Sequence, residues 1–263
     1  MRSVFLVLAI LATVLLPRSW ASEWSDTELH VLQGSGYRDT VDDEKFSRTV
    51  ITLQDTRGWS WGRTFYFIDF AKSDSRDQRN FEYYGEGYLV ASTQKLFKID
   101  WTGTPLKDLG LTAGINYGRK HSPFSPNARV VSFGGTLDLD VPKFDYFSID
   151  LLTYQNIGRY NGFGGGNLCG RHDTAYLISP YWKLPFQIGN AKFSFQGFTD
   201  IIGAHGDCKQ QVLAQPQLRW DVGNHFGNPD KVFLGFEYQY WRNKYGTPGL
   251  RDNVLQALLV FKL

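Results

Sequence analysis

Two neighbouring segments of the chain place aromatic and acidic side chains at every second position. These residues are Phe65, Phe67 and Asp69 in the first segment and Glu82, Tyr84 and Glu86 in the second. Aromatic rings offer flat faces for stacking, which is worth roughly 1–3 kcal/mol per ring in proteins that bind nucleic-acid bases. Carboxylates accept hydrogen bonds from hydroxyl groups. Together these groups could bind a small ligand that carries both a planar ring and hydroxyls.

A second interpretation of the same residues stays open. Phe65 and Phe67 could simply fill the interior of a narrow barrel, as side chains do in small barrels. The three carboxylates would lie close together across a hairpin, which is costly unless cations are near. Arg63, Arg171 and Arg219 are the basic residues that we expect to supply them.

Further polar and aromatic residues are expected on the same interior surface. They are Asp150, Tyr154, Asn156, Gln196, Asp200, Arg219, Gln239 and Trp241. Mixed charges interleaved with aromatics favour a small, neutral, polar solute over an ion. A salt-bridged lining that only stiffens the barrel is the alternative for any single residue.

The elements that must position these side chains are strands, because apolar residues recur with a period of two. Twelve candidate strands lie near 27–36, 47–56, 62–72, 81–92, 107–118, 129–141, 145–157, 173–184, 191–202, 211–222, 231–242 and 252–263. Each is about ten residues long, which suits a tilted strand that crosses a bilayer. The sequence predicts an all-β chain, a twelve-stranded antiparallel transmembrane β-barrel over residues 22–263. A secreted or periplasmic β-sandwich would also alternate.

Loop lengths and aromatic positions favour the barrel of an outer membrane. The connections 118–128, 158–172 and 203–210 are long, whereas 142–144 and 185–190 are short. Short turns on the periplasmic side and long outer loops are typical of such barrels, as are aromatic girdles at the two membrane interfaces. We therefore expect the outer membrane as the location, with lipid and lipopolysaccharide around the barrel.

Residues 1–21 are predicted to be a secretory signal peptide cleaved near Ala21. The apolar stretch 4–16 is too short for a spanning helix, which needs about 20 residues. Without Arg2 and Arg18 the 28 basic residues fall to 26, equal to the 26 acidic ones. This neutral balance gives no indication of a nucleic-acid partner.

Cys169 and Cys208 are the two cysteines of the chain. Strand parity places both in loops on the same outer side, and only one intramolecular pairing exists. Export through an oxidising compartment predicts a disulfide between them.

Three stretches carry a family resemblance: Arg63–Phe70, Tyr83–Leu89 and Ser179–Phe186. With the leader and the twelve strands, the chain resembles the Tsx-type nucleoside-specific channels of Gram-negative outer membranes, a group that includes OmpK-like phage receptors. The resemblance implies a monomeric barrel with a narrow lumen that passes nucleosides by facilitated diffusion. It also leaves open a role as a surface receptor for phage or toxins, or a channel for another small polar solute.

No catalytic site is expected. The five histidines are scattered, without the spacing of a metal site or a nucleophile motif. We therefore predict a protein that is not an enzyme and that has no metal or cofactor.

Overall fold

The computed structural model describes residues 22–38, 44–77, 80–120, 128–157 and 173–263. The strands are β1 (Trp24–Arg38), β2 (Lys45–Trp59), β3 (Gly62–Ser73), β4 (Phe81–Ser92), β5 (Leu106–Lys120), β6 (Arg129–Leu139), β7 (Tyr146–Asn156), β8 (Thr174–Ile188), β9 (Ala191–Ile202), β10 (Gln211–Ala214), β11 (Gln217–Asp221), β12 (Val232–Arg242) and β13 (Arg251–Lys262). Short helical segments interrupt the connections: α2 (Thr93–Phe97), η2 (Gly223–Phe226) and η3 (Lys244–Gly246). No helix within these ranges is long and apolar enough to cross a membrane. The predicted leader, 1–21, lies outside the described residues.

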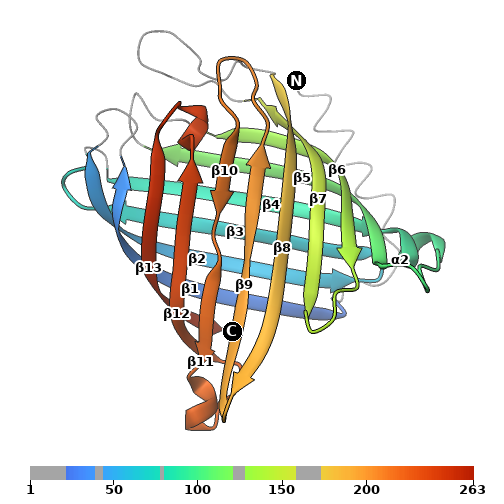
Figure 1. Ribbon diagram of the computed structural model, residues 1–263. Coiled ribbons are helices and arrows are strands. Elements are labelled where there is room, and N and C mark those ends of the chain that lie inside the picture. Colours follow the sequence, from blue (N-terminus) through green and yellow to red (C-terminus); the bar gives the residue numbers. More distant parts are fainter. Residues whose placement is uncertain (1–21, 39–43, 78–79, 121–127, 158–172) are drawn as a thin grey trace.

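The sheet closes on itself. Each strand pairs antiparallel with its neighbours, and β13 returns to β1 with a register that runs from Glu28↔Lys262 to Gly34↔Gln256 (Figure 1). A closed sheet leaves no unpaired strand edge, which is the condition for strands in hydrocarbon. The predicted antiparallel barrel is confirmed, and the soluble β-sandwich is not what the chain forms.

Thirteen strands occupy twelve positions in the wall. β10 and β11 both pair with β9 on one side and β12 on the other, so they are one strand broken at Gln215 and Pro216. Pro216 has no N–H to give to the ladder. Gly197 lies opposite the break with φ +148°, and a Cβ there would come within 2.4 Å of the Gln215 carbonyl oxygen. The predicted strand 211–222 is therefore present with an interruption that the alternation did not indicate.

The two faces of the wall have opposite character. On β5, Leu111 and Ile115 point outward and are 52% and 63% exposed, whereas Thr112 and Asn116 point inward and are 0% and 6% exposed. β13 repeats the pattern, with Leu255 and Phe261 outside and Gln256 buried. An apolar exterior around a polar interior is the arrangement of membrane barrels.

The barrel has two distinguishable ends. We call the end where β1 begins and β13 finishes the terminal end, and the opposite one, where β1 finishes and β13 begins, the loop end. The connections predicted to be short, 142–144 and 185–190, lie at the terminal end, where β8 and β9 are joined by residues 189–190 alone. The same end also has the longer 93–105 connection with α2. There the Ser92 hydroxyl accepts from the Lys95 amide at 3.0 Å and caps α2. Loop length therefore follows strand parity only in part.

Candidate functional site

The β3–β4 hairpin directs the predicted aromatic and acidic residues into the barrel. Its register sets Phe67 opposite Glu86 and Asp69 opposite Tyr84. The Phe67 ring centroid lies 6.1 Å from that of Phe65 and 6.0 Å from that of Tyr84. The intervening residues of β3, including Phe70, face outward. The hairpin thus presents a continuous aromatic row to the lumen.

Glu86 is the centre of the hydrogen bonds beside this row. Its carboxylate accepts from the hydroxyls of Tyr84 and, at 2.9 Å, Tyr88. The Asn116 amide donates to the same carboxylate at 2.8 Å and to the Tyr84 hydroxyl at 3.0 Å. The Asn116 Oδ1 is buried without a hydrogen-bond partner.

Five inward carboxylates are held by neutral donors alone. Asp69 accepts from Thr52 at 2.5 Å, Asp150 from Thr136 at 2.5 Å and Asp200 from Ser179 at 2.5 Å. Glu237 accepts from three glutamine side chains, as Glu86 does from its tyrosines and Asn116. None of the five forms an ion pair with another described residue. Glu86, Asp150 and Asp200 lie within electrostatic range of one another.

The lumenal arginines pair with other carboxylates. Arg63 binds Asp138 through two bonds of 2.6 and 2.8 Å. Arg219 is 3% exposed and holds Glu28 through bonds of 3.1 and 2.9 Å. The expectation that Arg63 and Arg219 neutralise Asp69 and Glu86 is therefore wrong, because closure of the barrel brings other acids to these guanidiniums. Arg171 lies outside the described residues.

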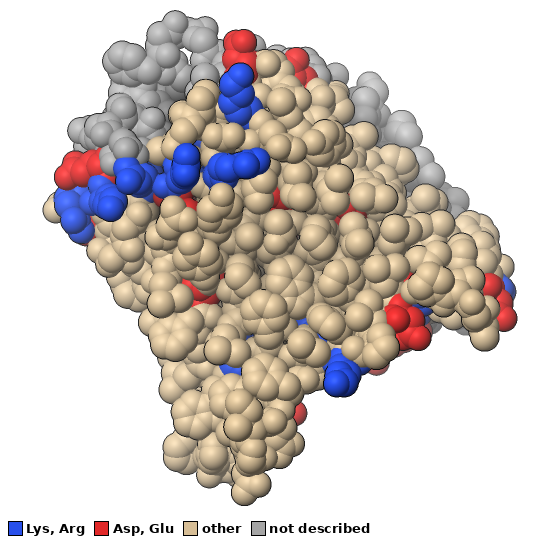
Figure 2. All heavy atoms as spheres, in the orientation of Figure 1, with Lys and Arg blue, Asp and Glu red and all other residues tan. Residues whose placement is uncertain are grey.

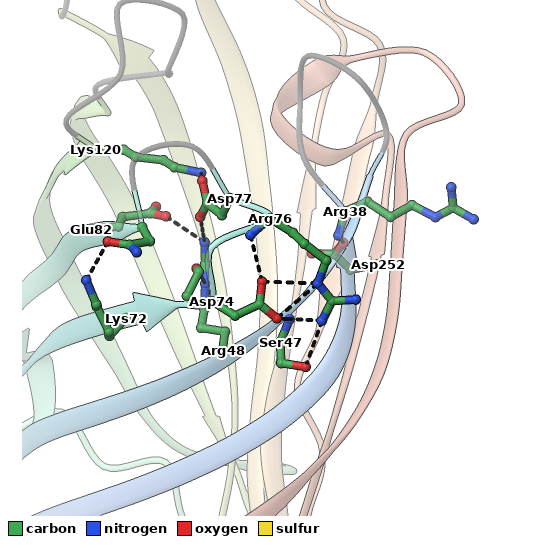
Figure 3. Close-up of polar contacts among 12 residues, drawn as sticks. Arg38, Ser47, Arg48, Lys72, Asp74, Arg76, Asp77, Glu82, Lys120 and Asp252 are labelled. Carbon is green, nitrogen blue, oxygen red and sulfur yellow. Dashed lines mark hydrogen bonds and ion pairs between the residues drawn. The ribbon is translucent and has the colours of Figure 1, made fainter.

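A chain of ion pairs lies at the loop end (Figure 3). Arg48 binds Glu82 at 3.1 Å and Asp77 at 3.7 Å, and Asp77 also binds Lys120 at 2.8 Å. Burial by itself raises the pKa of Asp77, but these cations lower it below its ordinary value. Glu82 thus has a cation, from a residue that the sequence analysis did not consider.

The remaining predicted lumenal residues lie on the inner wall but not together. Tyr154 packs on a small apolar cluster with Tyr88, and its ring centroid is 5.9 Å from that of His205. Trp241 packs on Tyr245 with a centroid distance of 4.5 Å. Asp150 and Asp200 belong with Glu86, as described above. Cys208 is buried at the loop end, and Cys169 lies outside the described residues.

Sequence reasoning missed Glu237. Gln239 and Trp241 were expected inside on strand 231–242, and the same alternation places Glu237 on their face. Arg48 and Glu28 follow from the period of their strands in the same way. The ion-pair partners of Arg48 and Glu28 could not be predicted from this period, since they depend on which strands face one another across the lumen.

Comparisons with known proteins agree on the fold alone. No protein family matches the chain, and no curated protein matches it. The NanC porin structure has a TM-score of 0.54 at 14% identity, covering 90% of this chain and 100% of that one. The chain has the fold of a porin barrel. The translocator domain of the autotransporter NalP from Neisseria meningitidis gives a TM-score of 0.44 at 10% identity, over 100% of this chain and 96% of that one. Pseudomonas aeruginosa OccK11 gives a TM-score of 0.39 at 9% sequence identity, over 91% of this chain and 95% of that one. Membership of the Tsx-type family is not established by these matches.

Proposed function

We propose that this protein is an outer-membrane channel that passes small polar solutes, with nucleosides as the preferred class. The observation that carries the proposal is the inward row of Phe65, Phe67 and Tyr84 next to Glu86 and Asp69. A nucleobase can stack on such rings, and ribose hydroxyls can donate to the carboxylates.

The unpaired carboxylates add charge selectivity to this proposal. Within the described residues these five inward acids accept only from hydroxyl and amide groups, whereas Arg63 and Arg219 are already neutralised by other carboxylates. The field along the path is therefore negative, which repels anions and tolerates neutral or cationic solutes. Nucleosides are neutral at physiological pH, whereas nucleotides carry the phosphate charge that this lumen opposes.

Single-channel recording in planar bilayers tests the proposal. Adenosine and thymidine should block the ionic current in a concentration-dependent way, whereas a disaccharide and the corresponding nucleoside monophosphates should block less. If a sugar blocks and the nucleosides do not, the lumen serves another polar solute. If the refolded barrel carries no current, the channel assignment itself fails.

The receptor role expected for phage or toxins has no support from the described residues. It depends on the outer loops, and of these 121–127 and 158–172 lie outside the described ranges.

A further inference from the structure

A pocket opens on the outer wall of the barrel at the loop end. It has a volume of about 230 Å³ and is lined by Tyr117, Gly118, Arg119 and Arg129. Arg119 and Tyr117 are outward positions of β5, and Arg129 is the outward residue of β6 directly opposite Tyr117. The pocket therefore faces the surroundings of the barrel and not the lumen.

The aromatic side of the pocket holds one arginine in place. The Arg129 guanidinium lies 5.4 Å from the centroid of the Tyr117 ring, and Tyr117 stacks on Tyr83 at 6.0 Å. Stacking restrains a guanidinium while leaving its N–H groups free to donate. Neither Arg119 nor Arg129 forms an ion pair within the described residues. The loop that joins their strands, 121–128, contains no Asp or Glu.

Other outward cations that form no ion pair within the described residues follow the rim of the loop end. Outward residues near this rim include Lys45, Lys72, Arg242 and Arg251, and no Asp or Glu faces outward in the last four residues of any described strand there. Figure 2 shows part of this row as blue side chains gathered toward one end of the wall.

Exposed cations also occur at the terminal end, where several of them have acidic partners. Arg57 pairs with Asp55 at 2.8 Å, Lys107 with Asp140 at 3.4 Å and Lys183 with Asp145 at 3.3 Å. Lys98, Lys143, Lys192 and Lys231 are exposed at the same end and form no ion pair within the described residues. Unpaired cations therefore lie at both ends, and the pocket lined by Arg119 and Arg129 belongs to the loop end.

The apolar outer surface of the barrel begins next to the pocket, on the side toward the middle of the strands. Ile115 lies two residues from Tyr117 on β5, Phe133 lies four from Arg129 on β6, and each is 63% exposed. A ligand held at the arginines would therefore rest its remainder on an apolar surface. A phospholipid or lipid A has this arrangement, with a phosphate group next to apolar acyl chains. Guanidinium is the side-chain group that best matches phosphate.

We propose that the pocket formed by Tyr117, Arg119 and Arg129 binds an anionic phosphate headgroup of a lipid in the leaflet around the loop end. The two guanidiniums donate to the phosphate oxygens, and the acyl chains lie along Ile115 and Phe133. The remaining outward cations of this rim gather further anionic lipid less specifically. The inference concerns the outer wall and is independent of what passes through the lumen.

Native mass spectrometry of the detergent-solubilised full chain tests the site with lipid A, which carries two phosphates. The double variant R119Q/R129Q should bind lipid A about 25-fold more weakly than the wild type, because each lost charge near a membrane surface corresponds to about fivefold. K107Q is the matched control, since Lys107 is an exposed cation on the same strand at the other end. It should bind as the wild type does.

Three outcomes would overturn the proposal. The first is a double variant that retains wild-type affinity, and the second is an equal loss in K107Q. The third is displacement of the lipid from the wild type by millimolar inorganic phosphate, which would make the pocket a site for free anions. Should the double variant not refold, as judged by heat-modifiable migration in SDS, the comparison of lipid A with zwitterionic phosphatidylcholine on the wild type decides. Equal affinity for the two lipids refutes the site.

Discussion

At the scale of single residues, the interior separates two kinds of charge. Arg63 donates to Asp138 from two nitrogens, and one nitrogen of Arg219 donates to both oxygens of Glu28. Such pairs serve the structure more than they serve a solute. Glu86 and Asp200 accept hydrogen bonds from neutral donors and form no ion pair within the described residues. The residues available to a solute are therefore the second set, together with the aromatic row.

Phe67→Ala should weaken nucleoside block of the channel by about 1–3 kcal/mol, because one stacking face is lost. The matched control is Phe70→Ala on the same strand, whose ring points outward and is 47% exposed. Block titrations on both variants give the comparison. Equal affinities in Phe67→Ala and the wild type would mean that the ring only fills space.

Glu86→Gln should reduce the preference of the channel for cations. The amide keeps a carbonyl acceptor for Tyr84 and Asn116, which both donate to the same oxygen of Glu86. It removes a charge, which at about 4 Å is worth about 1 kcal/mol in water, or fivefold in permeability ratio. Reversal potentials in a salt gradient measure the change. Glu82→Gln is the comparison, because Glu82 is already paired with Arg48 and its loss should alter selectivity less. An unchanged reversal potential in Glu86→Gln would contradict the assigned role of the charge.

At the scale of elements, ion pairs and hydrogen bonds hold the β3–β4 connection to neighbouring strands. Asp77 is 2% exposed and bridges Lys120 of β5 to Arg48 of β2. Asp74 accepts from Arg76 and from the Ser47 amide at 2.9 Å (Figure 3). The hairpin that presents the aromatic row is thereby tied at its loop end.

Asp77→Asn should destabilise the barrel by about 3 kcal/mol at neutral pH, since it breaks a buried ion pair. The pKa of Asp77 in the folded protein lies below its unfolded value of about 3.9, so its stabilisation is complete above that value. It is lost as pH falls through the folded pKa. The Tm difference between wild type and variant should therefore persist from pH 7 to about pH 4 and shrink in stronger acid.

Asp207→Asn is the control for that measurement. Asp207 is exposed at the same end and forms no ion pair with the residues described. Its substitution should leave Tm unchanged at every pH. A Tm difference for Asp77→Asn that does not vary with pH would show that shape, and not charge, is what Asp77 contributes.

The break between β10 and β11 depends on one glycine. Gly197→Ala should lower refolding yield and stability by about 1–3 kcal/mol, because its Cβ would approach the Gln215 carbonyl oxygen at 2.4 Å and φ is +148°. Gly87→Ala is the control, since a Cβ there meets nothing closer than 3.9 Å. Urea unfolding in detergent compares the two. Equal stability would mean that the wall relaxes at the break.

At the scale of the whole molecule, closure decides which distant segments meet. Cys208 is buried beside η3, where its sulfur lies 3.7 Å from the Tyr245 carbonyl oxygen. The Cys169–Cys208 disulfide stays a prediction. Mass spectrometry of non-reduced peptides from outer-membrane protein should find the two cysteines joined. Such a disulfide should stabilise the folded protein by about 3–4 kcal/mol, because it lowers the conformational entropy of the unfolded chain. Two freely alkylated thiols would refute it.

The alternation of side chains was enough to predict the strands and their faces. Phe65, Phe67, Asp69, Glu86 and Asp200 all point inward as expected, because the direction of a side chain in a strand depends only on its position in a two-residue period. That period is local, and it can be read from a few neighbouring residues. The same reasoning could have found Glu237.

Only the tertiary structure decided which charges meet. Arg63 pairs with Asp138, 75 residues away, and Arg219 with Glu28, 191 residues away. Neither partner follows from a local pattern, because Arg63 and Asp138 meet through the curvature of the wall from β3 to β6, whereas Arg219 reaches Glu28 through the pairing of β13 with β1. The same closure left Asp69 and Glu86 without cations. Arg119 and Arg129 come together on the outer wall for another reason, because the β5–β6 pairing sets Tyr117 opposite Arg129 and the two-residue period turns these side chains outward.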